Sequence, residues 1–140
     1  MEPKSKNVVV LSASVDGAEQ ETGEYIANKL SYYFHLDSVD VVDRSQIHAF
    51  EIAFELNGRR VFSPKETHLL NEKLKGDYYI LSHIKRLNPT EDEYEFSIKV
   101  LDPSFKLLKV HYTTFKLDEY SFYDDLSRGL EKVVWYKKWF

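Results

Sequence analysis

Runs of apolar residues alternate with amphipathic segments along the first half of the chain, and this order predicts an α/β fold. The runs at 7–12, 39–42 and 77–87 are rich in Val, Ile and Tyr, which is typical of strands buried on both faces of a sheet. Between them, apolar residues recur at helical spacing over 19–34 and 47–56. Each helix therefore connects two strands of the predicted sheet.

A third helix is predicted by the motif Ser-Pro-Lys-Glu at 63–66. Its serine and glutamate can cap each other's backbone N–H groups, and its proline has the φ angle that a first helical residue needs. The helix that follows places Leu70 and Leu74 in the core. Gly76 is predicted to end it, because glycine adopts the left-handed conformation common at that position.

The last third of the chain predicts a hairpin followed by a helix. Residues 94–100 alternate strictly between apolar and polar types, which indicates a strand with one solvated side. A turn at 102–104 returns the chain, and 107–117 form the partner strand. The closing helix starts near Ser121, and Gly129 is predicted to let it lie close to the sheet.

Together these segments predict a single α/β domain over residues 1–140, with 1–6 disordered. The expected order is β-α-β-α-α-β-β-β-α. Two right-handed crossovers feed a mixed sheet of about five strands. Crossover helices and a C-terminal helix cover the sheet and make three layers.

Composition excludes several classes of function but adds little about the fold. A net charge of −4 and a pI near 5.7 argue against general nucleic-acid binding, which needs a basic face. The chain has no cysteine, so disulfides, thiol catalysis and cysteine-ligated metals are excluded. No apolar run of about 18 residues and no leader-like segment is present. Two interpretations stay open: a cytosolic protein, or a mature domain from which a leader has been removed.

Candidate chemistry is sparse. There is no glycine-rich phosphate loop, no nucleophile elbow and no His-Glu-x-x-His pair, so we predict no catalytic residue, no cofactor and no enzymatic activity. His83 and His111 could be neighbours in the sheet and start a zinc site, but ordinary strand histidines are favoured and no metal is predicted. Arg44 could bind a partner's carboxylate through two hydrogen bonds, although a structural ion pair or cap is favoured.

The C-terminus carries more aromatic residues than one helical stripe can bury. They are Trp135, Tyr136, Trp139 and Phe140, with lysines interleaved. Such a segment suits a partner's groove, a membrane interface or packing against further chain. The alternative is an aromatic plug over an open sheet face. These four residues and Arg44 are the candidate partner-binding residues.

Several segments, in their order, resemble a family of bacterial envelope proteins. That family includes the curli secretion channel subunit CsgG, the penicillin-binding-protein activator LpoB, the flagellar outer-membrane protein FlgO and the TolB N-terminal domain. The matching segments are Val-Val-Val-Leu-Ser at 8–12, Glu-Tyr-Ile-Ala-Asn-Lys-Leu at 24–30, Val-Asp-Val-Val-Asp-Arg-Ser-Gln-Ile at 39–47, Lys-Gly-Asp-Tyr-Tyr-Ile-Leu-Ser at 75–82, and the hairpin at 98–108. Ser82 stands where the family often has glycine, and the turn after Asp102 lacks its usual glycine.

The resemblance implies binding rather than chemistry. Family members help to assemble, anchor or activate envelope machines, and many are lipoproteins. It therefore implies a protein partner in such a machine, a periplasmic or envelope location, and membrane association only through a lipid anchor or the partner. Homo-oligomerisation stays open, and no nucleic acid is expected. The alternative is a cytosolic regulatory or sensor domain of a larger protein.

Overall fold

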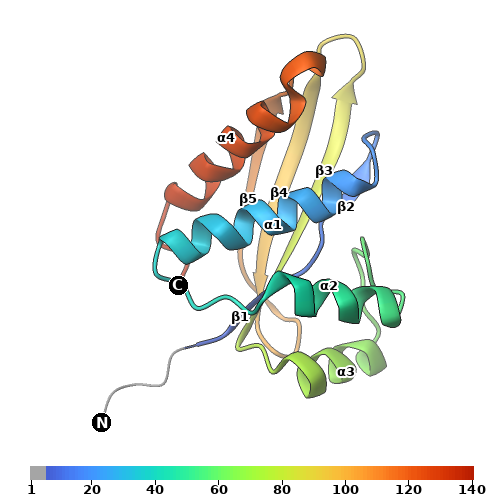
Figure 1. Cartoon of the computed structure of the whole chain (residues 1–140), viewed down its shortest axis with the longest axis vertical. Coiled ribbons are helices and arrows are strands. Elements are labelled where there is room, and N and C mark those ends of the chain that lie inside the picture. Colours follow the sequence, from blue (N-terminus) through green and yellow to red (C-terminus); the bar gives the residue numbers. More distant parts are fainter. Residues whose placement is uncertain (1–5) are drawn as a thin grey trace.

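The computed structural model describes residues 6–140, which form three layers (Figure 1). The elements are, in order, β1 (Val8–Val10), β2 (Ser14–Asp16), α1 (Glu21–Leu36), α2 (Arg44–Ala53), α3 (Pro64–Leu74), β3 (Tyr78–Asn88), β4 (Glu93–Leu101), β5 (Leu107–Lys116), the short 3-10 helix η1 (Glu119–Ser121) and α4 (Phe122–Trp135). No helix among these residues is long and apolar enough to cross a membrane. The predicted α/β class and C-terminal helix are confirmed.

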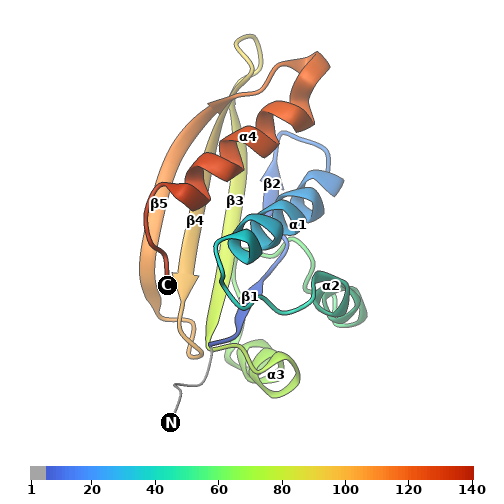
Figure 2. The ribbon, with the colours of Figure 1, turned by 60° about the vertical axis from the view of Figure 1, so that its left-hand side comes forward.

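The sheet is mixed and has five strands, as predicted. Its order is β1-β3-β4-β5, and β2 also pairs with β3, further along that strand. β1 and β2 run parallel to β3, whereas β3, β4 and β5 form antiparallel neighbours. β5 therefore lies at one outer edge of the sheet (Figure 2).

One of the five strands is not where the sequence predicts it. Residues 39–42 contribute only a single parallel bridge, between Val41 and Val8, and β2 supplies the fifth strand instead. The reason is the start of α2 at Arg44, directly after this segment. The Arg44 guanidinium donates a hydrogen bond to the carbonyl oxygen of Val10 at 2.7 Å. The side chain thus takes a backbone acceptor that a longer parallel ladder would use.

Helices cover the two faces of the sheet unequally. α1 and α4 pack on one face, where they bury apolar side chains of every long strand. α2 and α3 pack on the other face, mainly against β1 and the start of β3 (Figures 1 and 2). The large core comprises, among others, Val8, Val10, Ile26, Leu30, Phe34, Ile80, Ile84, Phe96, Ile98, Leu126, Leu130 and Trp139; the small core comprises Val9, Leu11, Ile47, Leu56, Leu70, Leu74, Tyr79 and Leu101. Consequently, the outer part of β5 on the α2–α3 side has no helix over it.

The ends of α3 show one prediction confirmed and one corrected. The capping box is present: the Ser63 hydroxyl accepts from the Glu66 N–H at 3.2 Å, and the Glu66 carboxylate accepts from the Ser63 N–H at 2.8 Å. The left-handed residue after the helix is Lys75, with φ of 51°, and not Gly76. Gly76 is needed for close packing, because a Cβ there would lie 2.8 Å from a methyl of Val9.

The start of the chain lies largely outside the described residues. Residues 1–6 were predicted to be disordered. Of these, 1–5 lie outside the described residues, and only Lys6 can be compared with the prediction. Lys6 has a defined contact, because its ammonium donates to the Tyr78 hydroxyl at 3.0 Å. This hydrogen bond raises the pKa of Lys6 above its ordinary value.

Gly23 lets α1 pack closely against the chain just before β2, and our first prediction concerns this residue. Gly23 accepts a hydrogen bond from the Ala13 N–H at 3.1 Å, and a Cβ at Gly23 would overlap the carbonyl oxygen of Ala13. Gly23→Ala should therefore push α1 away from the chain before β2. Overpacking of this kind costs about 1–3 kcal/mol, which exceeds the gain of about 1 kcal/mol from alanine's helix propensity.

Urea unfolding of the wild type and the variant measures this loss. Glu21→Ala, at an exposed first-turn position of the same helix, is the control and should cost less than about 1 kcal/mol. A Gly23→Ala protein as stable as the wild type would show that α1 can shift without loss of packing.

Candidate functional site

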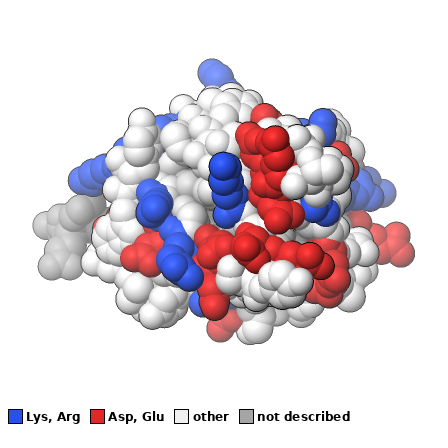
Figure 3. Space-filling model, turned by 90° about the horizontal axis from the view of Figure 1, so that it is seen from above, with Lys and Arg blue, Asp and Glu red and all other residues white. Residues whose placement is uncertain are grey.

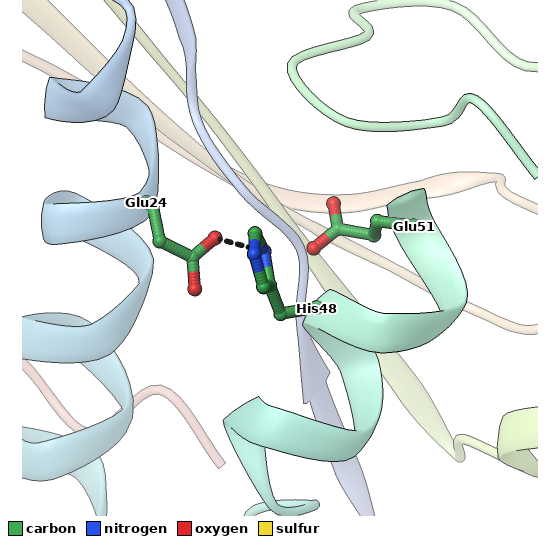
Figure 4. Close-up of side chains that lie close together, drawn as sticks. All are labelled: Glu24, His48 and Glu51. Atoms are coloured by element: carbon green, nitrogen blue, oxygen red, sulfur yellow. Dashed lines mark ion pairs between the residues drawn. The ribbon is translucent and has the colours of Figure 1, made fainter. Parts of the chain in front are cut away.

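A polar cluster joins α1, α2 and the end of β1. Arg44 lies at its centre: its guanidinium donates to Glu24 at 2.5 Å and to Glu51 at 3.1 Å. Figure 4 shows Glu24 and His48 facing each other, with Glu51 nearby on the next turn of α2. The Nδ1 atom of His48 lies 3.0 Å from Oε2 of Glu24 but is not aligned for a hydrogen bond. The cluster thus places two carboxylates around one guanidinium.

Glu51 is held by the interior of the protein. It is 1% exposed, and one carboxylate oxygen accepts from the Ser12 hydroxyl at 2.6 Å and from the Ser12 N–H at 3.0 Å. The same hydroxyl accepts from the Gly58 N–H at 2.9 Å. Because the buried carboxylate has both hydrogen-bond donors and a counter-charge, the desolvation cost of burying it is offset.

The cluster has the ligand types of a metal site, but its two carboxylates are already paired with a cation, Arg44. One ligand atom from each of Glu24, His48 and Glu51 falls within 4.8 Å of the others. A metal at this point would compete with the guanidinium of Arg44, which already bonds both carboxylates. Ser12, the hydroxyl beside Glu51, is 2% exposed, so it is not placed as an accessible nucleophile. The arrangement is a structural ion-pair network.

Arg44 is therefore engaged inside the fold. Its side chain is 9% exposed, and its remaining polar contacts are the Val10 carbonyl and the Asn28 side chain. The sequence left two interpretations of Arg44 open, a partner-binding residue and a structural ion pair. The observed contacts are those of a structural ion pair. A role in partner binding would require this network to open.

The four C-terminal aromatics divide into two inward and two outward residues. Trp139 is 2% exposed, and its indole N–H donates to the Val133 carbonyl at 3.1 Å. Phe140 packs against the rings of Phe34 and Tyr78, with centroids 5.6 and 5.1 Å away. Trp139 is therefore a core residue, which agrees with the alternative of an aromatic plug over the sheet. A role of these aromatics in partner binding stays a prediction.

Trp135 and Tyr136 face solvent, with 51% and 66% of their surface exposed. Tyr136 stacks on His111 of β5, with ring centroids 4.6 Å apart. Leu108 and Tyr112 of β5 are also exposed, on the side of the sheet away from α4. We call these four residues, which lie on both sides of the edge strand, the β5–α4 surface. Partly exposed aromatic residues of this kind are frequent anchors in protein interfaces.

His83 and His111 do not meet. In the strand register, His111 lies opposite Ile98 and on the α4 side of the sheet, whereas His83 lies opposite Ser97 and on the other side. The nearest partner of His83 is the Ser14 hydroxyl, 2.6 Å from Nδ1. Burial lowers the pKa of both histidines. The positive charge of Arg60 lowers the pKa of His83 further, and that of Lys137 lowers the pKa of His111 further. The pair cannot start a zinc site.

Carboxylates gather at the end of the molecule where α1 and α4 begin (Figure 3). An open hollow of about 760 Å³ lies there, lined by Glu19, Asp92, Glu119 and Asp124 among aromatic side chains. The pKa of Glu19 is raised, because its protonated carboxyl donates a hydrogen bond to the carboxylate of Glu21, whose negative charge acts in the same direction. Acidic residues are favoured at helix N-termini by the helix dipole, which accounts for much of this charge without a ligand.

The Ser12–Glu51 contact is the part of this chemistry that the sequence analysis missed. The signal was present in α2, where Arg44, Ile47 and Glu51 follow one another at spacings that share a helix face. An arginine and a glutamate on the same face as a core isoleucine indicate a buried ion pair.

The fold defines a class of small three-layer α/β domains with a mixed sheet, and solved structures of this class are known. No protein-family model and no curated protein matches the chain. The lipoprotein GNA1162 from Neisseria meningitidis is similar, with a TM-score of 0.58 and 10% identity over 82% of this chain and 83% of that one. The LpoB C-terminal domain from Salmonella enterica gives 0.54 and 10%, over 80% and 83%.

A third structure, the PelC dodecamer from Paraburkholderia phytofirmans, has a TM-score of 0.61 and 12% identity, over 93% of this chain and 85% of that one. At these identities the likeness establishes the fold. The resemblance that the sequence predicted is thus confirmed for LpoB at the level of fold. The link to CsgG, FlgO and TolB stays a prediction.

Proposed function

We propose that this chain is a non-catalytic protein-binding module of a bacterial cell-envelope assembly, located in the periplasm. The observation that carries the proposal is the β5–α4 surface, where exposed aromatics border an outer strand of the sheet. The shared fold of a lipoprotein and of LpoB supports the envelope setting. The shared fold of PelC, solved as a dodecamer, supports homo-oligomerisation as one form of assembly.

The composition of this surface is that of an interface rather than of a reaction centre. Trp135, Tyr136 and Tyr112 are each more than half exposed. Aromatic side chains supply large contact area at low cost in conformational entropy, because they have few rotatable bonds. Beside them, the outer edge of β5 offers backbone groups to an added strand.

Fractionation of cells that express the native full-length protein tests the location, with crosslinking before lysis. We expect the protein in the envelope fractions, with envelope proteins or further copies of itself as crosslinked partners. Recovery in the cytosol without such partners would overturn the proposal and would favour a cytosolic regulatory or sensor domain.

The double variant Trp135→Ala/Tyr136→Ala tests the surface. We expect at least a tenfold loss of the crosslinked partner, because interface aromatics commonly contribute about 2 kcal/mol or more each. Since both residues are exposed, the free energy of unfolding should change little.

The matched control is Tyr120→Ala, which removes a side chain that is 95% exposed at the far end of the molecule, in η1. It should leave crosslinking unchanged. If the control and the double variant lost the partner equally, the β5–α4 surface would not be the binding surface.

A further inference from the structure

β5 has an open edge. It pairs with β4 on one side and, within residues 6–140, with no strand on the other. In an antiparallel edge strand, alternate residues direct their backbone N–H and C=O groups away from the neighbour. Because β5 is 10 residues long, it offers an extended row of such groups.

A groove of about 570 Å³ lies between this strand and α4. His111, Thr113 and Phe115 form its β5 wall, and Gly129 and Tyr136 belong to its α4 wall. The absence of a side chain at Gly129 lets the helix approach, because a Cβ there would lie 2.8 Å from the Phe115 ring. The side chains of a strand added beside β5 would enter this groove at alternate positions.

The groove is positively charged although the chain is acidic. Its α4 wall carries Arg128 and Lys132 and one carboxylate, that of Asp125, which leaves an excess of one positive charge (two minus one). The whole chain has a net charge of −4. Arg128 lies 3.7 Å from Asp125, whereas Lys132 has no ion pair among the described residues.

The opposite side of β5 is apolar. Leu108 and Tyr112 are 46% and 60% exposed there, with Val110 between them. Strand residues alternate between faces, so a segment lying along β5 meets cations with one set of side chains and apolar surface with the other.

We propose that β5 takes up one extended segment of a partner protein in which acidic residues alternate with apolar residues. The segment's backbone pairs with the free edge of β5. Its carboxylates face Arg128 and Lys132 in the groove, and its apolar side chains cover Leu108 and Tyr112. This inference rests on the proposed function and specifies the chemistry of the partner.

The charges on β5 itself disfavour β5 of a second copy as the occupant. β5 carries Lys109 and Lys116, and pairing two such edges would bring like charges together. Lysines on an edge strand commonly prevent self-association in this way. An acidic segment is attracted where a second basic edge is repelled.

Selection from a displayed library of random decapeptides tests the proposal, with the purified full chain and its Arg128→Glu/Lys132→Glu variant as parallel targets. We expect the peptides enriched on the wild type to alternate Asp or Glu with apolar residues. A synthetic copy of one such peptide should bind the variant at least ten times more weakly, and its affinity should fall with rising salt.

The control Lys65→Glu/Lys73→Glu makes the same change in net charge on exposed positions of α3, and it should retain most of the affinity. Enriched peptides without the acidic alternation, or equal affinity for the wild type and the groove variant, would overturn the proposal.

Backbone methylation separates strand addition from simple charge attraction. Methylating the amide nitrogens of one alternate set in the selected peptide should abolish binding, because that set pairs with β5. Methylating the other set should leave binding nearly unchanged. If both methylated peptides bound as well as the parent, the strand-addition geometry would be wrong.

The selection uses purified protein and is independent of cellular location. An acidic peptide that binds a protein found only in the cytosol would support the groove inference and contradict the envelope role. An envelope protein whose groove selects no acidic peptide would contradict the groove inference alone.

Discussion

Replacing Trp139 with alanine should lower the free energy of unfolding by about 3–5 kcal/mol, the usual cost of deleting a buried tryptophan. The side chain is 2% exposed and lies in the large core. The substitution also leaves the Val133 carbonyl without the indole N–H that now bonds it at 3.1 Å. Urea unfolding followed by circular dichroism measures the loss.

Trp135→Ala is the matched control, four residues earlier in the same segment. Its side chain is 51% exposed, and substitutions at such positions change stability by about 0.5 kcal/mol or less. Equal stability losses in the two variants would contradict the division of these aromatics into core and surface. A stable Trp139→Ala protein would restore Trp139 as an interface residue.

Arg44→Ala should have a comparable effect for a different reason. The guanidinium is the counter-charge of Glu51, a carboxylate that is 1% exposed. Removing one partner of a buried pair costs about 3–5 kcal/mol, because the other charge stays buried without compensation. The same substitution frees the Val10 carbonyl and the Glu24 carboxylate.

Two further variants make the Arg44 result specific. Arg59→Ala removes an exposed ion pair to Glu66 at 2.7 Å and should cost less than about 1 kcal/mol. Arg44→Ala combined with Glu51→Gln should recover part of the loss, since an amide is cheaper to bury than an unpaired carboxylate. If the double variant were as unstable as the sum of the single ones, the two residues would not be coupled.

The sequence predicted those features of the fold that depend on local pattern. The alternation at 94–100 predicted β4, and the Ser-Pro-Lys-Glu motif at 63–66 predicted the start of α3. Gly129 was expected to bring the last helix close to the sheet, and the Phe115 ring fills the space beside it. For β4 and α3 the neighbours in sequence determine the outcome, and for Gly129 the small side chain itself was the signal.

Other features depend on contacts between distant segments, which a local pattern does not contain. Residues 39–42 have the composition of a strand, yet the side chain of Arg44 competes for the carbonyl of Val10. Trp139 is buried because the chain bends after α4 and returns its indole to Val133. The aromatic residues of the candidate surface can be identified from the sequence, but the sequence does not show which of them face the core.

The topology of the sheet also has a consequence for how the chain folds. β3, β4 and β5 are joined by short turns, whereas β1 reaches β3 only after α1, α2 and α3 have been placed. Closing short loops costs less entropy, so the three-stranded meander can form before β1 is incorporated. A nascent chain then exposes two unpaired borders, one on β3 and one on β5. Lys109 and Lys116 place charge on the β5 border, and lysines on an unpaired strand commonly disfavour aggregation before the rest of the sheet has formed.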